Sequence, residues 1–148
     1  MKHRITAAAI ATTAALGATC AFLVPAASAS PSAKSHTLTF ISVTESMVNF
    51  SRTSVGQQDK DVNKAGKTIG YDLLSVAFNP KTETAKLNVT VVTSGGFVYA
   101  VASGNASSAI RGTLTGGTGS FKGAAGTILA KNINKAGTRT AVTITYHT

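Results

Sequence analysis

The stretch "GGTGSFKGAAG", residues 116–126, places five glycines and two alanines around one Phe and one Lys. A P-loop would end in Gly-Lys-Ser/Thr, but Lys122 here lies between Phe121 and Gly123. A dinucleotide fingerprint has the spacing G-x-G-x-x-G, and the glycines at 117, 119 and 123 are one residue too far apart. Both motifs also open a helix, whereas the "AAGTILAKNI" at 124–133 has the pattern of a strand. The sequence therefore excludes a phosphate-binding loop and favours a turn between strands.

The rest of the chain alternates apolar and polar residues and is rich in Val, Ile and Thr, which is typical of short antiparallel strands. The polar segment 49–67 is predicted to be a long loop with one short strand around 55–59. The other strands are predicted at 36–48, 68–78, 84–94, 97–104, 108–116, 123–133 and 138–147. Seven or eight such strands indicate a sandwich or a barrel, and a barrel leaves no open sheet edge.

Within this architecture the glycine stretch has a structural interpretation. The first three glycines supply the positive φ angles of a tight turn, the Phe plugs the end of the barrel, and the last two glycines permit a bend or a close backbone approach. The predicted structural turn comprises Gly116, Gly117, Gly119, Phe121, Gly123 and Gly126.

The N-terminus has the order of a secretory signal. Lys2 and Arg4 precede an apolar run rich in Ala and Thr, and Ala27-Ser28-Ala29 follows as a cleavage site. We therefore expect a signal peptide at 1–29, a flexible lead at 30–35 and a single barrel domain at 36–148. The product is expected to be secreted and extracellular, without stable membrane insertion, because no second apolar segment follows. Its only cysteine, Cys20, lies in the signal, so no disulfide would stabilise the mature chain.

Without the signal the chain has 12 Lys and Arg against 5 Asp and Glu, a net charge of +7. The basic residues are scattered, so they indicate a solvated exterior with nonspecific attraction to acidic surfaces. Nucleic-acid binding is not expected, because it would need a clustered basic patch with interleaved aromatics. A metal site is not expected either, since the mature chain has only His36 and His147 and no cysteine.

Two stretches resemble the dirigent and allene oxide cyclase-like barrel family. "LTGGTGSFKGAAGTI" is similar to its "GGTGxFxGAxG" signature, and "VGQQDKDVNKAGKTIGYDLLSV" is similar to the segment before its second strand. The resemblance covers residues 55–148 and implies an eight-stranded, calycin-like closed barrel. It also implies a possible homo-oligomer, a dimer or a trimer, and a lumen open to an apolar or phenolic small molecule. In that family the lumen steers cyclisation or stereoselective coupling by positioning its substrate, without metal or cofactor.

The resemblance suggests two carboxylates as catalytic groups. Asp59 matches the acidic segment, although it could equally belong to a solvated turn with Lys60 and Asp61. Asp72 alternates with Gly70 and Leu74 and could face inward, where an apolar lumen would raise its pKa and let it act as an acid or a base. An outward Asp72 paired with a Lys is the alternative.

The ligand-binding candidates are the polar-tipped aromatics and one arginine that could line the lumen, although each tyrosine could equally be part of the core or the barrel wall. They are Tyr71, Tyr99, Arg111 and Tyr146. We expect a secreted, small-molecule-binding barrel, which would act as an isomerase or a dirigent-like protein if it is active. The alternative is a noncatalytic extracellular module that binds the cell surface or a protein partner through its basic exterior.

Overall fold

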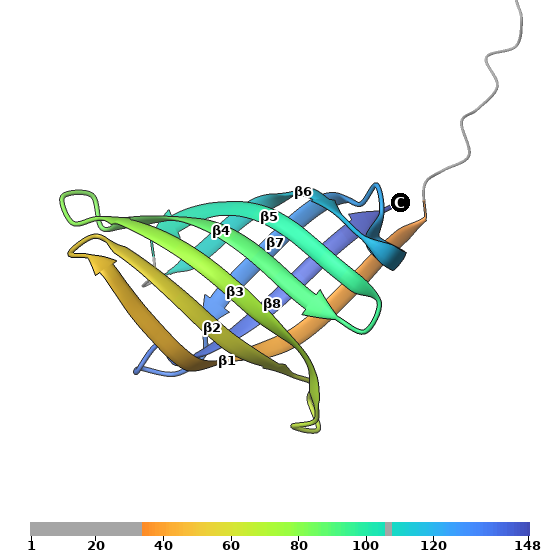
Figure 1. Ribbon diagram of the computed structural model, residues 1–148, viewed down its shortest axis with the longest axis horizontal. Helices are drawn as coiled ribbons and strands as arrows, with labels where there is room; N and C mark the ends of the chain where they lie inside the picture. The colour runs from red at the N-terminus through yellow and green to blue at the C-terminus, as the bar shows by residue number, and fades with distance from the viewer. Residues whose placement is uncertain (1–33, 106–107) are drawn as a thin grey trace, which may run out of the picture. The chain divides into compact units, whose positions relative to one another are not determined.

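The computed structural model describes residues 34–105 and 108–148, and these form a closed antiparallel barrel. Each strand pairs with the next along the chain, and the last strand pairs with the first (Figure 1). The strands are β1 (Ser35–Ser51), β2 (Ser54–Val62), β3 (Thr68–Asn79), β4 (Thr84–Thr93), β5 (Gly96–Asn105), β6 (Ala109–Gly117), β7 (Ala125–Asn132) and β8 (Arg139–His147). The eight-stranded closed barrel expected from the sequence is confirmed.

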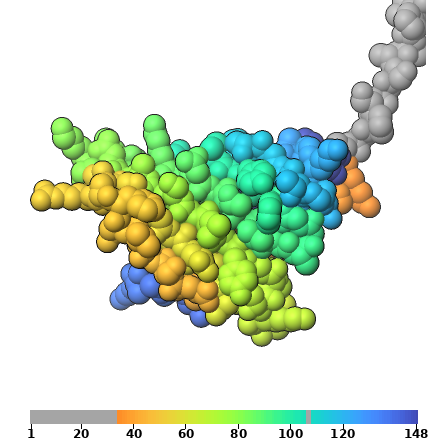
Figure 2. Space-filling view, viewed as in Figure 1, coloured from red at the N-terminus to blue at the C-terminus, as the bar shows by residue number. Residues whose placement is uncertain are grey.

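Strand alternation separates the barrel wall into an inner and an outer face. In β5 the side chains of Val98, Ala100 and Ala102 are buried, whereas those of Phe97 and Tyr99 between them are exposed. Successive side chains of a strand point to opposite faces, so one face of each strand fills the lumen and the other meets solvent. Figure 2 shows these outward side chains covering the wall of the barrel that faces the viewer.

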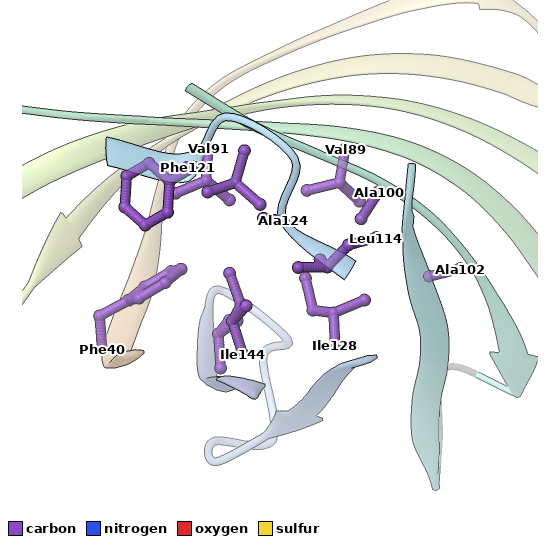
Figure 3. Close-up of a cluster of buried hydrophobic side chains, with 12 residues drawn as sticks. Phe40, Val89, Val91, Ala100, Ala102, Leu114, Phe121, Ala124, Ile128 and Ile144 are labelled. Carbon is purple, nitrogen blue, oxygen red and sulfur yellow. The ribbon is translucent and has the colours of Figure 1, made fainter. Parts of the chain in front are cut away.

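One end of the barrel, which we call the closed end, is filled by side chains. The one-turn helix η1 (Gly119–Phe121) lies between β6 and β7 and inserts Phe121, which is 7% exposed. Phe40, Phe121 and Ile144 come from three different elements and point toward the same space (Figure 3). Phe121 therefore fills this end of the barrel together with the neighbouring core side chains.

Gly116 and Gly119 have the positive φ expected of them, but Gly117 does not, and Gly123, which was expected to permit a bend or a close approach, has φ +78° with open space around it. Gly119 has φ +58°, a conformation that side chains rarely adopt, and its position leaves no room for a Cβ beside the carbonyl oxygen of Gly95. Gly126 has an ordinary φ, but a Cβ there would collide with the carbonyl oxygen of Thr145 on β8. The turn therefore needs a positive φ at Gly119, whereas Gly126 is needed for the close approach of β7 to β8.

The interpretation of residues 49–67 as a long loop is wrong. β1 extends to Ser51 and β2 covers Ser54–Val62, so the short strand predicted around 55–59 is one part of a nine-residue strand. The polar composition of β2 concealed it, because Gln57, Asp59 and Asp61 follow one another along its inner face.

The predicted signal peptide at 1–29 lies outside the described residues, as does most of the predicted lead. Within the described part of the chain, no helix is long and apolar enough to cross a membrane.

Candidate functional site: an acid-lined cavity in the barrel

The lumen contains a cavity of about 210 Å³. It reaches from the middle of the barrel toward the end opposite η1, which we call the open end and where the β7–β8 connection contributes Gly137. Most of its wall is aliphatic. The aliphatic lining residues are Leu74, Val76, Ala85, Leu87, Val89, Val91, Ala102, Ala109, Ile110, Ile128, Ala130 and Val142, together with the aromatic Phe40.

Asp59 is the best-satisfied acidic group of the cavity wall. The Ser42 hydroxyl on β1 donates to Asp59 Oδ2 at 2.7 Å, and Gln57 Nε2 lies 2.8 Å from each of its carboxylate oxygens. The same Gln57 amide also contacts Thr44 Oγ1 at 3.1 Å, which fixes its orientation. Hydrogen bonds from neutral donors hold this carboxylate in place inside the barrel.

Asp72 lies directly opposite Asp59 on the neighbouring strand β3 and also lines the cavity. It is 3% exposed, and its Oδ1 has no hydrogen-bond partner. Ser42 is close enough to interact with both carboxylates, but its single hydroxyl proton is donated to Asp59. Asp72 is therefore the carboxylate of the cavity wall that lacks donors.

Asp61 lies behind these two groups, one step along the inner face of β2 toward the closed end. It is 1% exposed, does not line the cavity, and has no donor at either carboxylate oxygen. Its side chain meets that of Asp72, and two carboxylates can hydrogen-bond only if one of them carries a proton. The pair is therefore arranged to share a proton.

Burial and like charge raise the pKa of both members of the pair. Burial, followed by the charges of Asp72 and Asp59, raises the pKa of Asp61 from 3.8 to about 9. Burial and the charge of Asp59 raise the pKa of Asp72 to about 6, while the nearby Ser42 hydroxyl and Asp61 carboxyl work in the opposite direction. Both shifts favour a protonated carboxyl, so the pair holds a proton near neutral pH.

Charge is distributed unevenly between the lumen and the exterior. Asp59, Asp61 and Asp72 are three of the chain's five acidic residues, and all three are buried inside the barrel. The other two are exposed, and Glu45 forms an ion pair with Lys60 on the outer face at 3.0 Å. In the described part of the chain, no Lys, Arg or His lines the cavity, and no group of three His, Cys, Asp or Glu is arranged to hold a metal ion.

The structure brings together the two predicted catalytic candidates but not the predicted ligand-binding set. Asp59 and Asp72 are adjacent and face inward, so neither a solvated turn nor an outward Asp72 is present. Tyr71 and Tyr99 are 43% and 36% exposed on the outer face. Arg111 is also on the outer face, beside a groove that it shares with Lys86 and Ser103.

These three residues therefore do not line the lumen, and their prediction as lumen contacts is corrected. The strand positions immediately next to each of them face inward, because one residue changes the face of a strand. Tyr146 does face inward, but it lies at the closed end, where its ring stacks on His36 at 5.3 Å and contacts Phe121 at 5.4 Å. It belongs to the packing of that end rather than to the cavity wall.

Three residues of the site were missed by the sequence reasoning: Ser42, Gln57 and Asp61. Their signal is the alternation "Q-x-D-x-D" at 57–61, which places three polar side chains on one face of a strand. A polar inner face is the opposite of the usual pattern for a core strand, and here it coincides with the acidic side of the lumen.

No family model matches the chain, and no curated protein is similar to it in sequence. Its fold is shared with solved structures. The pterocarpan synthase dirigent protein GePTS1 superimposes with a TM-score of 0.66 at 20% identity, over 78% of this chain and 89% of that one. A pyocyanin demethylase gives a TM-score of 0.63 at 16% identity, over 74% of this chain and 98% of that one.

The Diels-Alderase AbmU from Streptomyces koyangensis gives a TM-score of 0.61 at 9% identity, over 80% of this chain and 70% of that one. Proteins of this shape therefore include a dirigent protein, a demethylase and a cyclising enzyme. At these identities the likeness concerns the fold, and the fold is the eight-stranded barrel of the dirigent proteins, as the glycine stretch at 116–126 predicted.

Proposed function

We propose that the protein binds a small, largely apolar organic molecule in the cavity and steers its cyclisation or coupling. The observation that carries this proposal is the position of Asp72, a buried carboxyl with a pKa of about 6 on the wall of a mostly aliphatic cavity. A group that titrates near neutral pH can both give and take a proton during a reaction. The fold shared with a dirigent protein and a Diels-Alderase supports this type of reaction.

In this proposal the three aspartates have different roles. Asp72 lies on the cavity wall and exchanges a proton with the bound molecule. Asp61 meets Asp72 from behind, and the two share the proton that Asp72 gives to the ligand and takes back by the end of the reaction. Asp59 is held by Ser42 and Gln57, and its negative charge keeps the pKa of Asp72 raised. The aliphatic wall excludes water and fixes the shape of the ligand, so that catalysis rests on positioning and one proton transfer.

We propose further that the protein is exported and acts outside the cell, as its N-terminal sequence suggests. Native mass spectrometry of the protein from its own culture fluid tests the export and the binding together. We expect the mass of residues 30–148, which would show cleavage after Ala29, and an adduct of one small molecule per chain. Full-length chain retained inside the cell would contradict the export, without affecting the proposal for the cavity.

Two variants test whether the molecule of the adduct is bound inside the lumen. Ala102 lines the cavity and Ser103, the next residue, lies on the outer face. We expect Ala102→Leu to lose the adduct because the added methyl groups occupy the cavity, and Ser103→Leu to retain it. If both variants retain the adduct, the molecule binds elsewhere and the proposed lumen function is wrong.

A second candidate is a noncatalytic module at the cell surface. Apart from the half-buried Lys60, all Lys and Arg side chains of residues 34–148 are exposed. Only two acidic side chains accompany them outside the barrel, so this exterior favours contact with acidic wall polymers. This function predicts retention on cells that decreases with salt. Equal retention at low and high salt would exclude the electrostatic form of it.

A further inference from the structure

The lumen contains acidic side chains without a matching positive charge. Asp59 and Asp72 line the cavity, and Asp61 lies directly behind them. One proton shared between Asp61 and Asp72 cannot neutralise three carboxyl groups, so negative charge remains within the barrel without a positive partner. A buried charge without a partner is costly, and buried charges in proteins are normally paired.

The surrounding elements supply no positive charge to Asp72. The side chains that face it are Asp59 and Asp61 from β2 and Ser42 from β1, while Val91 lies opposite it on β4. Asn132 and Thr140 are the polar groups that β7 and β8 add to the cavity wall, and neither is titratable. The nearest strand neighbour with a basic side chain is Lys60, which points outward to Glu45.

We propose that the molecule bound in the cavity is a planar ring that carries a positively charged nitrogen, and that its N–H groups donate to Asp72. This inference rests on the proposed function, because it specifies the ligand of the same cavity. Asp72 is 3% exposed and its Oδ1 lacks a donor, whereas Asp59 already accepts from Ser42 and Gln57. Asp72 therefore lacks both a hydrogen-bond donor at one oxygen and a positively charged partner, and a cationic N–H group of the ligand would supply both.

The dimensions of the cavity limit the ligand to one ring with a small substituent. Its volume of about 210 Å³ exceeds the roughly 150 Å³ of an apolar cavity that takes benzene. The aliphatic wall suits the ring, and the carboxylates occupy one side of it. A larger molecule would place this ring in the cavity and extend through the open end, beside Gly137 and Asn132.

A metal ion fits the same negative charge less well. In the part of the chain that the structure describes, no three acidic or His side chains are arranged as ligands of one ion, and Asp61 lies outside the cavity. Most of the cavity wall is aliphatic and offers nothing to a hydrated ion. An organic cation uses both the aliphatic wall and the carboxylates.

Three probes of nearly identical shape test the effect of ligand charge: benzamidinium is positive, benzamide is neutral and benzoate is negative. Their affinities for the mature protein would be measured by isothermal titration at pH 8 and at pH 5, with toluene as the uncharged ring alone. At pH 8 we expect benzamidinium to bind about tenfold more tightly than benzamide, because hydrogen bonds to charged groups are stronger than neutral ones. Benzoate should not bind detectably. At pH 5 the advantage of benzamidinium should fall to about threefold, since Asp72 is then protonated.

Matched variants test whether Asp72 causes the preference for benzamidinium over benzamide. Asp72→Asn keeps the shape of the side chain and removes its charge, so the preference for benzamidinium should fall to about threefold at pH 8 as well. Glu45→Gln removes one charge from the outer face and should leave the preference unchanged. The probe series on the native protein provides a result even if a variant does not fold.

The outcomes separate this inference from the function on which it rests. Equal affinity for benzamidinium and benzamide, or tight binding of benzoate, would overturn the cationic ligand while leaving a cavity that binds rings. Binding of toluene but of none of the three other probes would also overturn the cationic ligand. If neither toluene nor any of the three probes binds, the proposed function and this inference are both wrong.

Discussion

Asp59 and Asp72 face each other across the β2–β3 pair, and the single hydroxyl proton of Ser42 is donated to Asp59 at 2.7 Å. Because Ser42 donates to Asp59, the two neighbouring aspartates differ in the number of hydrogen bonds that they accept. Asp59 is held by hydrogen bonds, whereas Asp72 is left to titrate close to neutral pH. A buried carboxyl whose pKa is raised toward neutrality is typical of sites that transfer protons.

The buried carboxyls should make the protein less stable as the pH rises. Asp61 and Asp72 have raised pKa values in the folded state, so the folded chain binds more protons than the unfolded chain above pH 4. Their contribution is complete below about pH 4 and is lost progressively up to about pH 6 for Asp72 and about pH 9 for Asp61. Urea unfolding across this range measures the decline.

Asp61→Asn should remove the upper part of this decline. An amide stays neutral and donates to Asp72 at every pH, so the free energy of unfolding at pH 8 should rise by at least about 1 kcal/mol. Glu45→Gln on the outer face is the control and should change it little. A variant whose stability follows the same pH curve as the native protein would show that Asp61 does not hold the proton.

Ser42→Ala should both destabilise the site and change its titration. Loss of the hydroxyl removes a hydrogen bond from buried Asp59, at a cost of about 1–3 kcal/mol, and also removes an influence that lowers the pKa of Asp72. Carbon-13 NMR of the aspartate carboxyls would show the titration of Asp72 at a higher pH. Ser75→Ala on the exposed face of β3 should leave that titration in place.

Phe121→Ala should open the closed end at a large cost. The side chain is 7% exposed and packs against Tyr146, so its removal should lower the free energy of unfolding by about 3–5 kcal/mol. Lys122→Ala, at the exposed next residue, should change it by less than about 0.5 kcal/mol. Similar small losses in both variants would mean that η1 does not contribute to the core.

Gly126→Ala should destabilise the barrel although φ at this glycine is ordinary. The new methyl group would collide with the Thr145 carbonyl on the neighbouring strand, so β7 must move away from β8. We expect a loss of about 1–3 kcal/mol in thermal unfolding, against less than about 0.5 kcal/mol for the exposed control Thr127→Ala. An equal effect of the two variants would contradict the close approach of these strands.

The strand pattern predicted a sandwich or a barrel, and the resemblance of the glycine stretch to the dirigent signature implied the eight-stranded barrel. Turn glycines and alternating side chains act locally, through backbone sterics and the two faces of a strand, and such signals can be read along the chain. The same alternation identified Asp72 as a residue able to face inward. The same pattern failed for residues 49–67. A strand whose inner face is largely polar lacks the apolar alternation by which strands are recognised, so it resembles a loop.

The sequence by itself indicated a β-barrel with Phe121 at one end, and its resemblance to the dirigent barrels implied eight strands, while the direction of its aspartates stayed open. Only the tertiary structure decided that Ser42, Asp59, Asp61 and Asp72 meet, because they come from three strands whose register is set by barrel closure and by a bulge after Thr44. It also placed Tyr71, Tyr99 and Arg111 outside, since a shift of one residue along a strand exchanges lumen and solvent. Distances between side chains on different strands depend on that register, and no local pattern contains it.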